Sequence, residues 1–192
     1  MIIYLCRHGQ TTGDIEDRYG GDYEDHLTDL GKIQAEELAR KLQNRRIQKI
    51  FTSSRIRAQE TAKIISDILK VDVEIVHDLR ERNHYGILTG LIKSHAKKEH
   101  PDLVEKLSNH RIAITGAEDY ESFGQRVTAG LEKITARDLD TVCIISHGGP
   151  IRFIFREIIN FGEIDISDCA YAKLIWEYKR LSVLDLNGIT KK

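Results

Sequence analysis

Residues 141–149 read Thr-Val-Cys-Ile-Ile-Ser-His-Gly-Gly, an apolar run that ends in a histidine followed by two glycines. Residues 2–9, Ile-Ile-Tyr-Leu-Cys-Arg-His-Gly, repeat this pattern at the start of the chain. Short apolar runs of this length predict buried strands. Because glycine has no Cβ, it lets backbone N–H groups approach an anion closely. The two stretches therefore predict two strands that each bring a histidine and a glycine to an edge where an anion could bind.

Elsewhere in the chain, short apolar runs alternate with longer segments of helical period. Strands are expected at 50–52 and 71–76, and as a terminal antiparallel hairpin at 173–178 and 181–186. Helices are expected at 28–42, 56–69, 92–99, 103–107 and 151–159, and around Phe123, Val127, Leu131 and Ile134. This alternation predicts an α/β fold in which a mostly parallel central sheet has helices on both faces. In such sheets, ligands bind outside the carboxyl ends of the strands.

The chain shows no internal repeat, linker or low-complexity tract. We expect residues 1–192 to form one domain, in which the irregular and polar stretch 83–121 is an inserted cap. Its 29 Lys and Arg against 30 Asp and Glu give a formal net charge of −1. This balance argues against a nucleic-acid binder and against a polybasic membrane anchor. The N-terminus lacks the basic start of a signal peptide, so we expect a cytoplasmic protein.

Thiol chemistry is not indicated by the three cysteines, Cys6, Cys143 and Cys169. They include no CxxC pair, so neither a disulfide framework nor a zinc ribbon is expected. Cys6 and Cys143 lie inside apolar runs, which predicts small buried side chains.

Two further strand ends carry charged residues. Arg57 follows the strand at 50–52, and Glu81 follows the strand at 71–76. Arginine suits a phosphate because its planar guanidinium is always charged and offers two parallel hydrogen bonds. Together with His8 and His147, these residues form a set suited to phosphoryl transfer.

The motifs resemble those of the histidine phosphatase superfamily, also called the phosphoglycerate mutase-like family. The matches occur in the family's order and span residues 1 to 152. They are RHGQT at 7–11 (family RHGET), LTxxGxxQA at 27–35, the run at 53–62 (family SxLxRAxQTA), the segment around the acid at 79–90, Gly116 and Glu118 with Arg126, and SHGGxIR at 146–152.

The resemblance implies a three-layer α/β sandwich that needs no metal and no other cofactor. It assigns His8 as the nucleophile that takes the phosphoryl group, and Glu81 as the proton donor to the leaving oxygen. The phosphate would be held by Arg7, Arg57, His147 and the backbone of Gly148. His147 would also be a catalytic residue. Neighbouring arginines would favour the neutral imidazole that attack requires, and would neutralise the phosphoryl oxygens.

Five positions depart from the family pattern. Asp14 stands where the family has an asparagine that contacts phosphate, and a carboxylate there would repel a dianion unless it turned away. Gln10 replaces a glutamate, Glu60 a glutamine and Asp119 a serine. Arg55 replaces a leucine; it could reach an anionic substrate, but we expect an exposed arginine at the start of a helix.

The family contains both phosphatases and phosphoglycerate mutases. The segment 79–93 looks like the mutases' acid segment, whereas Ser-His-Gly-Gly at 146–149 has the phosphatase form and mutases usually read AHGN. We therefore favour a phosphatase, with a mutase as the alternative. A slow or inactive relative that binds a phosphorylated ligand is a third reading, which the intact set of site residues argues against.

The sequence leaves the substrate and the oligomeric state open. We expect a small phosphomonoester, because nothing suggests a groove for a phosphoprotein. The hairpin with Tyr171, Trp176 and Tyr178 could pair with another subunit as a homodimer, or it could be core. His84 could contact substrate or lie on the surface. The other histidines show no metal-ligand spacing.

Overall fold

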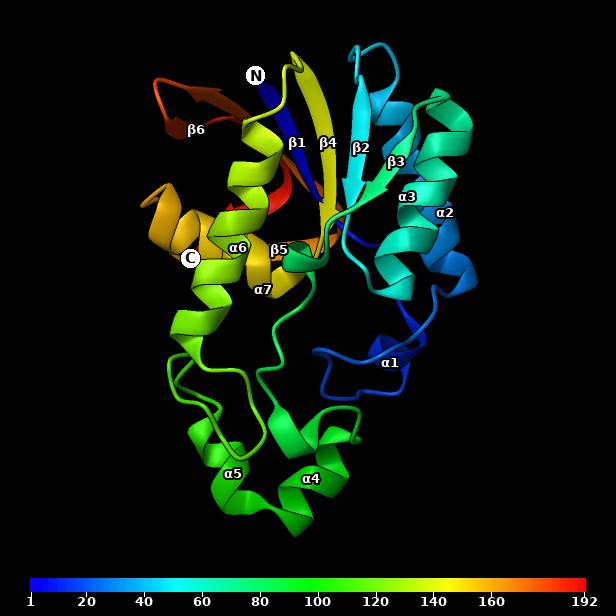
Figure 1. The fold of residues 1–192 in the computed structure, drawn as a ribbon. Coiled ribbons are helices and arrows are strands. Elements are labelled where there is room, and N and C mark those ends of the chain that lie inside the picture. The colour runs from blue at the N-terminus through cyan, green and yellow to red at the C-terminus, as the bar shows by residue number, and fades with distance from the viewer.

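The computed structural model describes all of residues 1–192 and contains a six-stranded mixed sheet (Figure 1). The strands are β1 (Ile2–Arg7), β2 (Lys49–Thr52), β3 (Val73–Ile75), β4 (Thr141–Ser146), β5 (Ile164–Glu177) and β6 (Arg180–Lys191). Their order in the sheet is β3-β2-β4-β1-β5-β6. The β3–β2, β2–β4 and β4–β1 pairs are parallel, and β5 runs antiparallel to both β1 and β6. The expected α/β fold with a mostly parallel sheet is confirmed.

Helices cover both faces of this sheet. The helices of the chain are α1 (Thr12–Ile15), α2 (Asp29–Leu42), α3 (Ile56–Leu69), α4 (Lys93–Glu99), α5 (Pro101–Lys106), α6 (Tyr120–Thr135) and α7 (Gly148–Phe153). Two short 3₁₀ helices, η1 (His77–Leu79) and η2 (Gly86–Leu88), and a π-helix, η3 (Ile154–Ile158), complete the set. No helix is both long enough and apolar enough to cross a membrane.

Alternate residues of the central strands feed two separate hydrophobic cores. Ile3 and Leu5 of β1 pack with the buried face of α6, and Tyr4 and Cys6 pack with α2 and α3. The two cores place the sheet as the middle of three layers, because side chains of a strand point alternately to its two faces. Cys6 and Cys143 are buried free thiols, as their apolar surroundings predict.

Side-chain caps set where the covering helices begin. Thr28 accepts a hydrogen bond from the backbone N–H of Gly31 at 2.9 Å and so begins α2 at the expected residue. Asp119 accepts one from Ser122 at 2.8 Å and begins α6. The Asp119 that departs from the family motif is therefore a helix cap.

The region between β3 and α6 lies below the carboxyl ends of β2 and β4 (Figure 1). It holds η2, α4 and α5 around a small core of Leu88, Ala96 and Ile114. The predicted helix at 103–107 begins earlier, at Pro101, where proline is well suited to the first helical turn.

The terminal hairpin is much longer than its alternation predicts. β5 begins at Ile164 instead of 173, and β6 continues to Lys191 instead of 186. Tyr178 and Lys179 join the two strands with φ angles of 50° and 58°. Two positive φ angles are typical of the tight turn whose twist fits a hairpin. The register of β5 against β6 shifts between Ile166 and Tyr171, and this irregularity hides the first half of β5 from a pattern of strict alternation. Conversely, β3 is shorter than the expected 71–76.

Candidate active site

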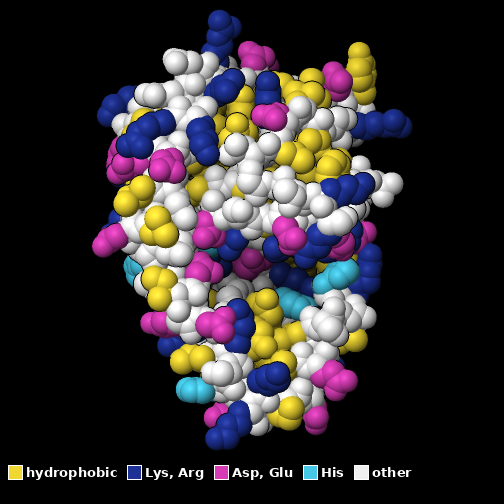
Figure 2. All heavy atoms as spheres, turned by 180° about the vertical axis from the view of Figure 1, so that it is seen from behind, with side chains coloured by type: hydrophobic (Ala, Val, Ile, Leu, Met, Phe, Trp, Pro, Cys, Tyr) yellow, Lys and Arg dark blue, Asp and Glu magenta, His cyan; other side chains and the backbone are white.

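The residues singled out from the sequence meet at one cavity of about 320 Å³ beside the carboxyl ends of β1 and β4. Arg7, His8, Arg57, Glu81 and Gly148 all line it. His147 is fully buried behind them, with its ring centre 5.0 Å from that of His8. From behind, charged and histidine side chains gather at the waist of the molecule, between the larger upper part and the smaller lower part (Figure 2).

His8 is held between one acceptor and one donor. Its Nδ1 lies 2.8 Å from the carbonyl oxygen of Gly9, so Nδ1 carries the proton, because a carbonyl can only accept. Nε2 is then the unprotonated nitrogen, and it accepts a hydrogen bond from Nε of Arg57 at 3.3 Å. Burial, followed by the charges of Arg57 and Arg7, holds the pKa of His8 well below its usual value. The ring is thus neutral near pH 7, with its lone pair on Nε2.

Arg57 is fixed by a loop that the sequence patterns did not single out. Its Nη1 donates to the carboxylate of Asp25 at 2.9 Å and to the carbonyl of Tyr23 at 2.8 Å, and its Nη2 donates to the carbonyl of Gly21 at 2.8 Å. Both members of the Arg57–Asp25 pair are buried. Asp25 therefore compensates a buried charge that would otherwise be costly.

Arg7 is held by the irregular part of β5. Its Nη1 lies 3.1 Å from Oδ1 of Asp168 and donates to the carbonyl of Ile166 at 2.9 Å. Burial raises the pKa of Asp168, and the nearby Arg7 charge offsets part of that rise. Asp168 lies where the register of β5 against β6 shifts, and no sequence motif marks it.

Ser53 sets the orientation of His147. Oγ of Ser53 accepts from the backbone N–H of Arg55 at 3.2 Å, and it lies 2.7 Å from Nε2 of His147. The structure shows no other acceptor for the Ser53 hydroxyl proton, so the hydroxyl donates this proton to Nε2, which leaves the proton of His147 on Nδ1. That buried Nδ1 has no partner within the protein. It is a donor free for an incoming oxygen. Burial and the Arg57 charge hold the pKa of His147 well below its usual value.

The Glu81 carboxylate accepts two backbone hydrogen bonds at the rim of the cavity. Oε1 accepts from Arg82 at 2.7 Å, and Oε2 accepts from Gly149 at 3.1 Å. A Cβ on residue 149 would lie 2.1 Å from Oε1 of Glu81, so a side chain there would displace the Glu81 carboxylate. Arg126, paired with Glu118, donates to the carbonyl of Glu81 at 3.1 Å. This explains why Glu118 and Arg126 belong to the motif although they lie away from the cavity lining.

The lower wall of the cavity contains residues that the sequence motifs do not mark. Arg82 is buried, donates to the carbonyl of Glu118 at 2.9 Å and stacks on the ring of Tyr120. His84 and His110 line the cavity and each has one buried ring nitrogen without a partner. Burial lowers the pKa of both. His84 therefore faces the cavity rather than the outer surface.

The departures from the family pattern have structural roles. Oδ2 of Asp14 accepts from the N–H and the hydroxyl of Thr11, both at 2.9 Å, in the cap of α1. Gln10 accepts from the Thr28 hydroxyl at 2.9 Å through its own side-chain oxygen, as a glutamate could. The expectation that Arg55 is exposed is wrong: its side chain is 22% exposed, because it pairs with Asp22 and Glu24.

Comparison with known proteins settles the family. A family model described as histidine phosphatase superfamily (branch 1) matches residues 3–188. The chain therefore belongs to the histidine phosphatase superfamily, as its motifs suggest.

Some relatives are named as mutase-like proteins and others as phosphatases. Phosphoglycerate mutase-like protein 4 of Arabidopsis thaliana is 31% identical over 160 residues, which cover 80% of this chain and 69% of that protein. The metal-independent phosphoserine phosphatase of Arabidopsis thaliana is 31% identical over 162 residues, which cover 81% and 68%. The crystal structure of the alpha-ribazole phosphatase from Shigella flexneri has the same fold, with a TM-score of 0.86 at 22% identity over 97% of this chain and 96% of that one.

Proposed function

We propose that the protein is a metal-independent phosphatase that hydrolyses small phosphomonoesters through a phosphohistidine on His8. The observation that carries this proposal is the state of the His8 ring, which is neutral, buried and proton-free at Nε2, with the Nε of Arg57 3.3 Å from that nitrogen. A neutral imidazole beside fixed arginines suits attack on a phosphate dianion.

In the first step, Nε2 of His8 forms a bond to phosphorus while the bond from phosphorus to the ester oxygen breaks. Glu81, at the rim of the same cavity, gives its proton to the departing oxygen, so an alcohol leaves. Arg7, Arg57 and the Nδ1–H of His147 stabilise the charge on the phosphoryl oxygens.

In the second step, water attacks the phosphohistidine. Glu81 is now a carboxylate and takes a proton from that water as the phosphorus–nitrogen bond breaks. Inorganic phosphate leaves, and Nε2 of His8 is again free. The two steps balance without a metal ion, because the arginines supply the charge that Mg²⁺ supplies in other phosphoryl-transfer sites.

The cavity lining favours a substrate with a second negative group. Seven of its side chains are basic and three are acidic: Arg7, Arg18, Arg57, Arg82, Lys93, Arg152 and Arg156 against Asp14, Asp25 and Glu81. Arg152 forms no ion pair within 4 Å, whereas the phosphate end uses Arg7 and Arg57. Phosphomonoesters that also carry a carboxylate, such as phosphoserine, suit this lining.

The test is phosphate release from a panel of phosphomonoesters in excess EDTA, by the wild type and by His8→Ala. The panel includes both phosphoglycerates, phosphoserine, and phosphoethanolamine, which lacks only the carboxylate of phosphoserine. We expect release by the wild type alone, with phosphoserine ahead of phosphoethanolamine. Equal release by His8→Ala contradicts the mechanism, and exchange of phosphoglycerate isomers without release makes the protein a mutase.

A further inference from the structure

The segment 21–27 crosses the cavity and contacts α3 with alternate residues. Gly21, Tyr23 and Asp25 offer their acceptors to Arg57 on the inner side. Asp22 and Glu24 lie between them in sequence and make their contacts with Arg55. The segment therefore has an inner row of acceptors, which contacts Arg57, and an outer row, which contacts Arg55.

The inner row determines where Arg57 points. Both protons of Nη1 and one proton of Nη2 are taken by this segment, and the Nε proton is directed at Nε2 of His8. A shift of the segment would move the three acceptors together. Arg57 would then lose the orientation that aims its Nε at the reacting nitrogen.

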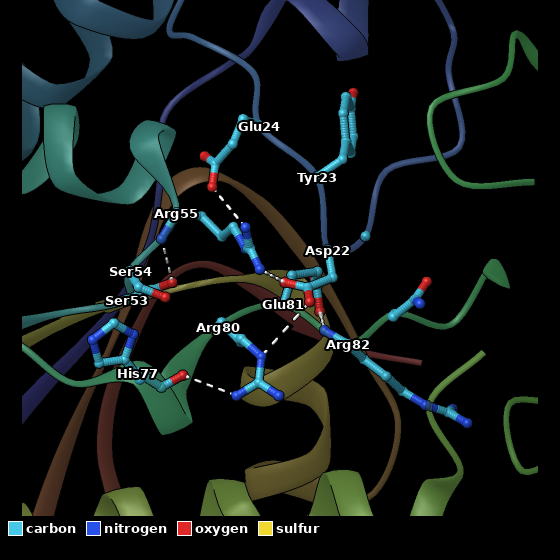
Figure 3. Close-up of polar contacts among 12 residues, drawn as sticks. Asp22, Tyr23, Glu24, Ser53, Ser54, Arg55, His77, Arg80, Glu81 and Arg82 are labelled. Atoms are coloured by element: carbon cyan, nitrogen blue, oxygen red, sulfur yellow. Dashed lines mark hydrogen bonds and ion pairs between the residues drawn. The ribbon is translucent and has the colours of Figure 1, made fainter. Parts of the chain in front are cut away.

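The outer row is held by Arg55, which begins α3 two residues before Arg57. Figure 3 shows the Arg55 guanidinium between Glu24 and Asp22, with ion pairs to both. Nη1 of Arg55 lies 2.6 Å from Oε1 of Glu24, and the backbone N–H of Ile56 donates to the other Glu24 oxygen at 2.9 Å. Arg80 approaches Asp22 from the other side at 3.7 Å, which is too long for a hydrogen bond.

Charge gives Arg55 a second effect. The segment carries carboxylates at 22, 24 and 25, and only Asp25 pairs with Arg57. Arg55 neutralises the other two, so they do not compete for the arginine that the phosphate needs. At 22% exposure, the Arg55 side chain is screened less than a fully exposed one.

We propose that Arg55 is a positioning residue, which holds Asp22 and Glu24 so that the segment 21–25 aims Arg57 at the phosphoryl group on His8. This inference rests on the proposed function of the site. It concerns a position at which the chain departs from the motif of its superfamily.

The test compares Arg55→Gln with Arg137→Gln, which breaks an ion pair of 2.6 Å to Glu74 far from the segment. Binding of inorganic phosphate is measured by calorimetry, and hydrolysis of p-nitrophenyl phosphate is measured in parallel. We expect phosphate binding to weaken about threefold or more in Arg55→Gln, as for other coupled neighbours, and to stay at the wild-type value in Arg137→Gln. Arg55→Lys, which keeps the charge, should recover part of the loss.

A double variant, Asp22→Asn with Glu24→Gln, separates positioning from general stability. If Arg55 acts through these two acids, adding Arg55→Gln to the double variant weakens phosphate binding no further. Fully additive losses overturn the inference, as does wild-type phosphate affinity in a folded Arg55→Gln. These outcomes are independent of turnover. A wild type that binds phosphate but hydrolyses no ester contradicts the proposed function and leaves the positioning role standing, whereas a wild type that binds no phosphate contradicts both.

Discussion

The Nε of Arg57 lies 3.3 Å from Nε2 of His8, while Nδ1 of the same imidazole lies 2.8 Å from the carbonyl of Gly9. The only N–H of the ring therefore donates to the backbone, and the unprotonated nitrogen faces an arginine. A phosphoryl group attached to Nε2 would meet that arginine at once. This arrangement couples the nucleophile and the phosphate-binding group in one contact.

Replacing Arg57 should change the ionisation of His8 as well as the rate. In Arg57→Gln, one cause of the lowered pKa of His8 is removed, so that pKa should move up towards its ordinary value of about 6.5. Without Arg57, the negative charge of Asp25 has no partner, and this charge also raises the pKa of His8. We expect kcat to fall about a hundredfold, as when one transition-state donor is lost. An NMR titration of the His8 ring checks the shift, and an unchanged or lower pKa would be inconsistent with the contact.

The buried histidines should make the protein less stable in weak acid. Folding lowers the pKa of His8, His147, His84 and His110, so the unfolded chain binds more protons than the folded one as the pH drops below about 6.5. The free energy of unfolding should therefore fall between pH 7 and pH 5.5. His26 has the opposite sign, because its contact with Glu60 raises its pKa, but it lies in solvent where the pair is screened.

Urea unfolding at the two pH values measures this dependence. His147→Gln should show a smaller difference than the wild type, because one of the contributing groups is gone. Greater stability at pH 5.5 than at pH 7 would contradict the assignment of buried neutral rings.

The hydroxyl of Ser53 should matter for catalysis although it does not line the cavity. In Ser53→Ala, Nε2 of His147 loses its hydrogen-bond partner, and the tautomer with the proton on Nδ1 is no longer favoured. We expect kcat to fall by about tenfold, the effect of one unsatisfied buried polar group. Ser54→Ala is the matched control, since the Ser54 hydroxyl forms no hydrogen bond in the structure. Equal activity of the two variants would show that Ser53 does not orient His147.

Gly149→Ala should disturb the acid without touching the nucleophile. The new Cβ would lie 2.1 Å from Oε1 of Glu81, so the carboxylate must move away. We expect slower hydrolysis of esters with poor leaving groups, which need the proton, and a much smaller effect on p-nitrophenyl phosphate. In a Glu81→Ala background the same glycine change should cost little. A uniform loss across all esters and backgrounds would instead point to damage elsewhere.

The sequence predicts those parts of the molecule that depend on local patterns. The strands that carry His8 and His147 are apolar runs with polar residues directly after them, and the cap of α2 is a threonine at its expected place. The motif residues Arg7, His8, Arg57, Glu81 and Gly148 do line one cavity. Local signals work here because parallel strands place their carboxyl ends at a common edge.

The rest of the site depends on contacts between distant segments. Asp168 pairs with Arg7 from the irregular part of β5, and Asp25 pairs with Arg57 from the segment 21–27. Neither residue lies in a periodic or motif context. The same holds for Arg55, whose partners Asp22 and Glu24 lie more than 30 positions away. A single sequence shows that Arg55 departs from its motif, but only the fold shows what replaces the missing leucine.

The most direct test of the account is to trap the phosphohistidine. The wild type is mixed with its best substrate, quenched with alkali within a turnover, digested and examined by mass spectrometry. We predict a single added phosphoryl group on the peptide that contains His8, absent from His8→Ala and increased in Glu81→Gln if that carboxylate activates the water. Hydrolysis that proceeds at full rate with no phosphoryl group on His8 would contradict the proposed function.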